Sequence, residues 1–212
     1  MASAANVTEH GRICESAVRP LSTRSLARFA SLALAWIALV ALSPPAVAGP
    51  IGSGPAAILG YSGDADGAHD PSDLVLASVG WRWRFDGADC IDDFLARGHI
   101  DFSWAVEPLV GGLFGDATAF ETSVVPYVRL APLGWENVVP YFEGGIGLAY
   151  ITLHNYGLGS PVEFSDNAGI GVTFGSAHRW SIGYRFRHLS HAGLFDDRND
   201  GLNAHFLTLS VE

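Results

Sequence analysis

Two residues near the C-terminus have the types and the spacing of a hydrolase pair. His188 and Ser190 are two positions apart. On a β-strand this spacing puts both side chains on one face, about 6–7 Å apart along the strand. A serine hydroxyl is a poor nucleophile at neutral pH unless a neighbouring base takes its proton, and histidine is the usual base. The pair therefore predicts a nucleophile, Ser190, and its general base, His188.

A third group normally holds the imidazole in the required tautomer. Asn203 is the candidate, because a hairpin that joins residues 190 and 203 would bring it beside His188 on an adjacent strand, about 4.8 Å away. Asn203 can orient an imidazole by hydrogen bonding, but it carries no charge. Three carboxylates of the intervening loop are charged alternatives, or simply solvated loop residues: Asp196, Asp197 and Asp200.

The segments that must position these residues have the pattern of β-strands. Apolar and polar residues alternate with a period of two, which is typical of strands with two different faces. Turn signals such as Leu133-Gly134 separate about eight such segments, which cover residues 54–62, 73–86, 98–109, 119–131, 138–151, 162–175, 178–190 and 203–211. No sustained helical period of 3.6 is found after residue 50. The pattern predicts an all-β protein with long antiparallel strands.

The two faces of these segments differ in kind. One face is apolar and carries aromatic residues near the segment ends, among them Trp81, Trp83, Trp104, Tyr150 and Tyr184. The other face carries small glycines together with both signs of charge: Arg82, Arg84, Asp101, Glu107, Glu121, Glu143, Arg185 and Arg187. An eight-stranded barrel has an interior just wide enough for side chains, so paired charges can fill it while the apolar face meets lipid.

These faces predict an eight-stranded antiparallel transmembrane β-barrel of the outer membrane. A secreted β-sandwich or a soluble lipocalin-like barrel shows the same alternation with the apolar face inside, so both stay alternatives. In the barrel, His188 and Ser190 share the lipid-facing side with Phe186 and Tyr184. At the barrel rim they could meet water or headgroups as structural residues; the functional interpretation is a hydrolase site that faces the membrane.

The first fifty residues have the pattern of an export signal. The apolar run Phe29–Leu42 is 14 residues long, whereas a membrane-spanning helix needs about 20. Arginines precede the run, and Ala46-Val47-Ala48 follows it as a small-x-small cleavage site. The segment predicts a signal peptide over residues 1–48 and a mature barrel over residues 49–212, with an uncleaved membrane anchor as the alternative. Cleavage would leave Cys90 as the single cysteine and so no intramolecular disulfide.

Composition excludes several classes of function. The net charge of −10 argues against a nucleic-acid binder, which works by neutralising phosphates. Hydrophobic residues make up 49% of the chain, which excludes intrinsic disorder. The histidines show no metal-ligand spacing, and no phosphate-binding glycine motif is present. We therefore expect neither a metal nor another cofactor.

The C-terminal motifs resemble those of a known enzyme family. The stretches His188–Leu194 (HLSHAGL) and Asn199–Asn203 (NDGLN) resemble the C-terminal signature of the PagL-type lipid A 3-O-deacylase (acyloxyacyl hydrolase) family. That pattern is H-x-S-N-A-G, then N-x-G, then an acidic residue on the last strand. The glycine-rich stretches Tyr141–Gly147 and Asn167–Val172 are also similar to strands of the family. The resemblance covers the chain from about Val138 onward.

The resemblance implies an outer-membrane barrel whose Ser190 and His188 face the lipid leaflet. It implies an esterase that removes the ester-linked 3-hydroxyacyl chain of lipid A, with lipopolysaccharide as substrate and outer-membrane lipids as neighbours. Two positions depart from the family. His191 replaces an asparagine implicated in the oxyanion site, which leaves the backbone amides of His191 and Ala192 for that role. Asn203 stands where the family has its acid.

The loss of that acid makes a non-catalytic barrel, structural or surface-interacting, the alternative function. In a serine protease triad the change from Asp to Asn slows the reaction about 10⁴-fold, although papain-like triads use asparagine in this place. The enzyme hypothesis requires the Ser190 hydroxyl within hydrogen-bond reach of His188 and Asn203 at the other imidazole nitrogen. A monomer and a homodimer are both open as oligomeric states.

Overall fold

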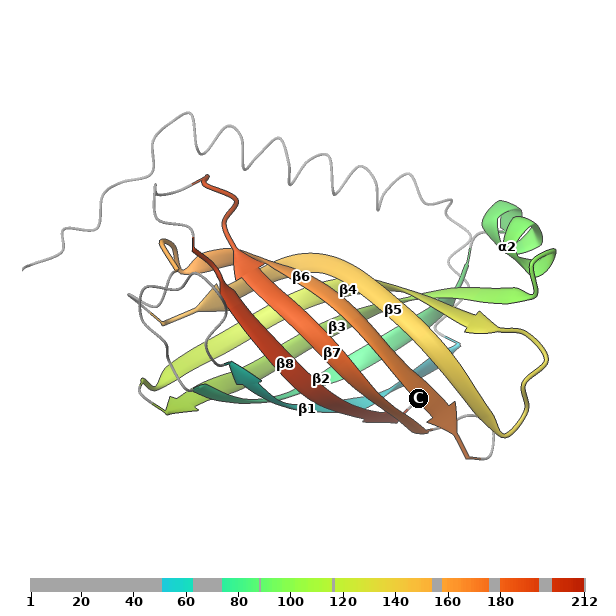
Figure 1. Ribbon diagram of the computed structural model, residues 1–212, viewed down its shortest axis with the longest axis horizontal. Coiled ribbons are helices and arrows are strands. Elements are labelled where there is room, and N and C mark those ends of the chain that lie inside the picture. The colour runs from blue at the N-terminus through green and yellow to red at the C-terminus, as the bar shows by residue number, and fades with distance from the viewer. Residues whose placement is uncertain are drawn as a thin grey trace, which may run out of the picture.

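The strands form one closed barrel. The computed structural model describes residues 51–62, 74–87, 89–115, 117–153, 158–175, 180–194 and 200–211. Each strand pairs antiparallel with the next one in the chain, and β8 closes the barrel on β1 (Figure 1). The strands are β1 Gly52–Ser62, β2 Leu74–Asp86, β3 Ile100–Gly115, β4 Ala119–Pro132, β5 Val138–Ile151, β6 Val162–Phe174, β7 Trp180–Ser190 and β8 Leu202–Val211. No helix in these residues has the length and hydropathy of a membrane span.

The eight predicted strands are confirmed, with two corrections. A short helix, α2 (Asp89–Ala96), lies between β2 and β3 (Figure 1), where the sequence predicted no helix. Strand β3 continues to Gly115, beyond the predicted end at residue 109, because it pairs along its whole length with β2 and β4. The predicted signal peptide, residues 1–48, lies outside the described residues.

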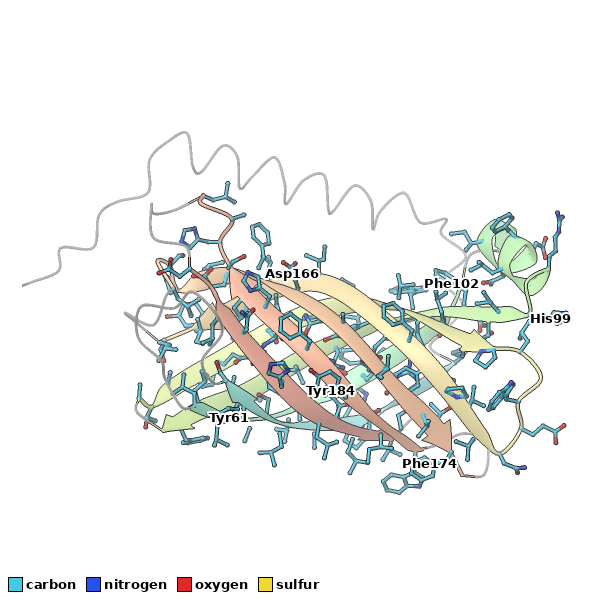
Figure 2. The ribbon with its side chains drawn as sticks, in the orientation of Figure 1. Tyr61, His99, Phe102, Asp166, Phe174 and Tyr184 are labelled. Atoms are coloured by element: carbon cyan, nitrogen blue, oxygen red, sulfur yellow. The ribbon has the colours of Figure 1, made fainter. Side chains whose placement is uncertain are left out.

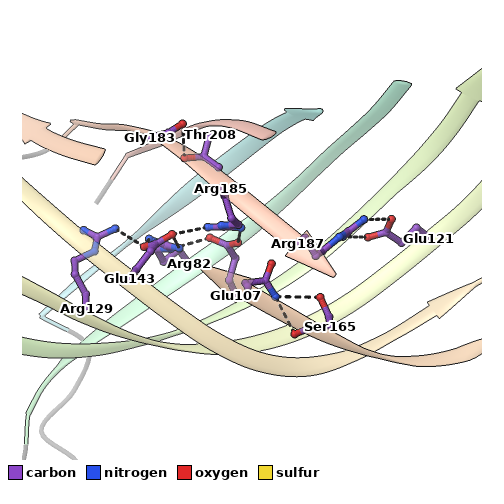
Figure 3. A network of polar contacts seen from close by, with 11 residues as sticks. Arg82, Glu107, Glu121, Arg129, Glu143, Ser165, Gly183, Arg185, Arg187 and Thr208 are labelled. Carbon is purple, nitrogen blue, oxygen red and sulfur yellow. Dashed lines mark hydrogen bonds and ion pairs between the residues drawn. The ribbon is translucent and has the colours of Figure 1, made fainter. Parts of the chain in front are cut away.

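The polar faces of the strands point into the barrel. Glu143 of β5 lies at the centre of a buried ion-pair network, where it accepts hydrogen bonds from Arg82 at 2.9 Å, Arg185 at 2.9 Å and Arg129 at 3.2 Å (Figure 3). Glu107 of β3 pairs with both Arg82 and Arg185 at 2.7 Å. These charges are fully desolvated, so each depends on its partners.

A second ion pair closes the lumen nearer the end of β7. Both terminal guanidinium nitrogens of Arg187, Nη1 and Nη2, contact the Glu121 carboxylate. The space left beside Arg185 and Arg187 is about 10 Å³, the room of about one water molecule. The predicted filled interior is therefore observed. Asp101, which the alternation placed on the inner face, is instead exposed near the start of β3.

The outer wall of the barrel is apolar. Ile170, Val79 and Leu207 are 60%, 59% and 58% exposed in mid-strand positions, and Figure 2 shows such side chains around the barrel. The aromatic residues Trp81, Tyr150 and Tyr184 also point outward. Exposed apolar side chains over a charged interior are typical of a transmembrane barrel and exclude the soluble sandwich and lipocalin-like alternatives, whose faces are reversed.

Candidate active site

Strand β7 carries the predicted nucleophile and base on the outer wall. His188 and Ser190 are half-buried and alternate with residues 187 and 189, which are buried inside. The polar residues therefore lie on the lipid-facing side of the barrel, at the end where β7 leaves the sheet. They are less exposed than the apolar side chains nearer the start of β7, such as Ile182 at 40% and Tyr184 at 47% exposure.

Strand β8 brings the third predicted residue to the imidazole. Asn203 is the register partner of His188, and its Oδ1 lies 2.7 Å from His188 Nδ1. The amide oxygen only accepts hydrogen bonds, so Nδ1 carries the proton and Nε2 has the lone pair that a general base needs. On the side of β1, the Ser62 hydroxyl donates a hydrogen bond to the backbone carbonyl of Asn203 at 2.6 Å, which links the backbone of β8 to β1.

Ser190 shares the outer face with His188 without bonding to it. Among the described residues, no hydrogen bond joins the Ser190 hydroxyl to the imidazole, and His188 makes one hydrogen bond, through Nδ1. Side chains two residues apart on a strand are separated by about 6–7 Å along it, so contact requires both to turn toward each other. Catalytic hydrogen bonds are often long without substrate and shorten in its complex.

Gly201 lies against the imidazole of His188. The last register pair of the β7–β8 hairpin, Leu189 and Leu202, places Gly201 beside Ser190. A Cβ atom on Gly201 would lie 2.5 Å from His188 Cε1 and 3.1 Å from Nε2, and its φ of +76° is in the left-handed region. Only glycine fits both conditions. Gly201 is the glycine of the N-x-G motif, but the motif does not indicate its contact with His188, which depends on strand register.

A tight turn follows the nucleophile. Ala192 and Gly193 have φ values of 51° and 69°, and the Leu194 amide donates to the His191 carbonyl at 2.9 Å. Two consecutive positive φ values are typical of a type I′ turn, which is uncommon for an alanine. The His191 side chain is fully buried in the barrel. The buried ring is therefore not available to a bound substrate, and an oxyanion role for His191 stays a prediction about its backbone amide.

A second histidine lies on the same wall, two residues along β8 from Asn203. His205 Nδ1 is 2.6 Å from the Tyr184 hydroxyl, and its ring centroid is 5.4 Å from that of Phe186. These contacts hold the His205 ring against β7, between the site and the apolar wall. In the described residues, no group of three or more His, Cys, Asp or Glu side chains is placed to hold a metal ion.

Strand β6 adds a carboxylate that the sequence analysis did not single out. Asp166 is the register partner of His188 on the side opposite Asn203. It is half-buried and lies between the inward residues Ser165 and Asn167, so it points outward. The alternation of residues 162–175 could have indicated that Asp166 faces outward. It could not indicate that Asp166 lies opposite His188, because that depends on the register of two strands.

Comparison with known proteins identifies relatives of this barrel. Residues 76–212 match the family described as lipid A 3-O-deacylase (PagL). The crystal structure of the outer membrane enzyme PagL is similar, with a TM-score of 0.58 and 21% identity over 74% of this chain and 98% of that one. Among curated proteins no match is found.

Two further solved structures are similar with lower TM-scores. Neisserial surface protein A has a TM-score of 0.45 and 11% identity over 75% of this chain and 94% of its own. The outer membrane protein Ail of Yersinia pestis has a TM-score of 0.29 and 14% identity over 75% of this chain and 99% of its own. The similarity to the PagL structure shows the fold, and the family match covers more than half of the sequence. The chain belongs to the lipid A 3-O-deacylase (PagL) family.

Proposed function

We propose that this barrel removes the ester-linked 3-hydroxyacyl chain from lipid A, with Ser190 as nucleophile and His188 as general base. The observation that carries the proposal is the 2.7 Å contact between His188 Nδ1 and Asn203 Oδ1, on the outer wall beside Ser190. This contact leaves Nε2 to accept the serine proton. The family match supports a lipid A ester as the substrate class.

The reaction proceeds in two half-reactions. The Ser190 oxygen attacks the ester carbonyl carbon while its proton passes to His188 Nε2. The tetrahedral intermediate then expels the sugar oxygen, which takes that proton, and the hydroxyacyl chain stays on Ser190. A water molecule, deprotonated by His188, attacks the acyl-serine and releases the 3-hydroxy fatty acid. Asn203 holds the imidazole in one tautomer through both steps.

The turn after Ser190 offers the groups for the developing oxyanion. Backbone amides placed at the carbonyl oxygen stabilise the negative charge, and removal of one such donor slows a serine protease about 10²–10³-fold. We assign this role to the amides of His191 and Ala192. The left-handed φ of Ala192 turns the chain sharply at this point, and the buried His191 side chain supports a backbone role.

The outer wall explains how such a site meets a membrane-embedded ester. The acyl chains of the substrate would lie along apolar side chains of β7 and β8, with the ester at the rim beside Ser190. An apolar hollow of about 540 Å³ lies farther along the wall, lined by Ala57, Leu59, Val79, Leu207 and Leu209. Leu207 is four residues from Asn203, about 13 Å along the strand.

Mass spectrometry of lipid A tests this function. Cells that make the native protein should yield lipid A lighter by one hydroxyacyl chain, and cells that make Ser190→Ala should not. Ser181→Ala is the matched control, because Ser181 is a buried serine at the opposite end of the same strand. Its lipid A should match that of the native protein.

An unchanged lipid A profile with native protein folded in the membrane would favour the non-catalytic barrel. Equal loss of the chain with native protein and Ser190→Ala would remove Ser190 from the reaction. The homodimer stays a prediction, which sedimentation of the purified barrel in detergent tests.

A further inference from the structure

Three polar side chains form a row across the outer wall at the candidate site. Asp166 of β6 pairs with His188 of β7, and His188 pairs with Asn203 of β8. All three are half-buried on the outward face, and Figure 2 labels Asp166 on β6 close to the end of β7. The candidate base therefore lies between an amide on one side and a carboxylate on the other.

Asp166 stands in an unfavourable place for a structural residue. Its outward neighbours on β6 include Phe164 and Ile170, and Ile170 is 60% exposed on the lipid-facing wall. In the part of the chain that the structure describes, the side chain of Asp166 makes no hydrogen bond or ion pair, although its strand pairs with β5 and β7. Ionisable residues on such surfaces are rare because hydrocarbon does not solvate charge, and they commonly mark functional sites.

The arrangement of the site supplies a use for this charge. In a triad the acid does two things: it fixes the imidazole tautomer, and it stabilises the imidazolium that forms when the serine proton arrives. The Asn203 amide does the first at 2.7 Å from Nδ1. A neutral amide cannot do the second, so the site as built from Ser190, His188 and Asn203 lacks a negative charge.

We propose that Asp166 supplies that charge, so that two strands that flank His188 divide the work of one triad acid: Asn203 orients the imidazole, and Asp166 stabilises its protonated form. Directly opposite side chains on neighbouring strands have Cβ atoms about 4.5–5.5 Å apart. The carboxylate and the imidazolium at their ends can therefore approach each other, and opposite charges attract more strongly where water is sparse. Asp166 acts through His188 and is thus a positioning residue. The inference rests on the proposed esterase function.

The other groups that face His188 do not fill this role. On β8 the nearest titratable group is His205, whose Nδ1 is bonded to the Tyr184 hydroxyl, and it would add positive charge if protonated. On β6, Glu163 is buried on the inner side. The described outward faces of β6, β7 and β8 hold no carboxylate besides Asp166.

Steady-state kinetics of the purified full-length barrel on lipid A tests the proposal. We expect Asp166→Asn to lower kcat about 10- to 100-fold with little change in KM, part of the 10⁴-fold loss seen when a triad acid loses charge and tautomer control together. Asp166→Glu restores the charge and should recover most of the rate. Asp101→Asn, an exposed strand aspartate at the opposite end of the barrel, is the matched control and should behave as native protein.

Moving the charge provides the sharpest comparison. Asn203→Asp places a carboxylate at the other side of His188, so the double variant Asp166→Asn with Asn203→Asp should regain the activity that Asp166→Asn loses. A merely structural aspartate would not be rescued from the far side of the imidazole. Native kcat in Asp166→Asn, or no recovery in the double variant when both proteins are folded, overturns the proposal.

Labelling of Ser190 by a fluorophosphonate probe separates this inference from the choice of substrate. The probe reacts with a base-activated serine whatever the natural ester. If the native protein is labelled faster than Asp166→Asn while lipid A stays intact, the substrate is wrong and the role of Asp166 stands. If lipid A is cleaved and both proteins react equally with the probe, the function stands and the role of Asp166 is refuted. Failure of both reactions in native protein refutes both.

Discussion

At the residue scale, the proposed site is centred on the His188 imidazole, which Asn203 holds through one hydrogen bond. The pair His188–Ser190 and the proximity of Asn203 could be predicted from period-two spacing and a hairpin between residues 190 and 203. The position of Asp166 and the contact of the motif glycine Gly201 with His188 could not. Both follow from the register of three strands, which alternation within one strand does not contain. The sequence therefore indicates the chemistry but not all of the groups around it.

Gly201 gives a sharp test at this scale. Gly201→Ala should lower deacylation about 10²-fold, the loss expected when a catalytic group is displaced by about 1 Å. The physical reason is that the new Cβ would lie 2.5 Å from His188 Cε1. The fatty acid released from lipid A by the purified variant is the measurement.

Gly134→Ala is the matched control for that change. Gly134 also has a left-handed φ, +84°, but a Cβ there would meet nothing within 4 Å. It should lose a little stability from backbone strain, about 1–2 kcal/mol, and keep native activity. Equal activities of the two alanine variants would show that the Gly201 contact does not position His188.

At the element scale, the strands are predictable and their ends are not. Alternation locates all eight strands, since each has one lipid-facing and one lumen-facing side. Strand β3 extends past its predicted end because β2 and β4 supply hydrogen-bonding partners there. The prediction stopped short because Gly111 and Gly112 interrupt the alternation of apolar and polar side chains. Helix α2 has eight residues, about two turns, too short for a period of 3.6 to stand out.

Ion pairs between inner side chains also join the strands, and substitution of Glu143 tests how much they contribute to stability. Glu143→Gln removes one carboxylate from between Arg82, Arg129 and Arg185. Breaking a buried ion pair by removing one partner costs about 3–5 kcal/mol, because the other charges stay buried without compensation. We expect a loss of this size in the free energy of unfolding, measured by denaturant titration in detergent.

Asp101→Asn is the control at the same scale. Asp101 is exposed near the start of β3, so its neutralisation should change the free energy of unfolding by no more than about 0.5 kcal/mol. If Glu143→Gln were as stable as Asp101→Asn, the network would not hold the strands together in the way described.

At the scale of the whole molecule, closure lets one narrow barrel carry a site on its outside. Buried ion pairs fill the described part of the lumen, and the proposed catalytic groups lie on the lipid-facing surface. The alternation of the sequence could not decide which face is inside. The structure shows that the polar face is inside. The buried residues include Glu107, Glu121 and Glu143, whereas the exposed residues include Val79, Ile170 and Leu207. That orientation places Ser190 where a membrane lipid can reach it.

The central claim is that Ser190, on the outer wall, cleaves an ester of a lipid in the same membrane. The most direct measurement is the release of 3-hydroxy fatty acid from lipid A in vesicles that contain the folded, purified protein. Native protein and Ser181→Ala should release one hydroxy fatty acid per lipid A, and Ser190→Ala should release none. Absence of release by folded native protein, or equal release by Ser190→Ala, would contradict the claim.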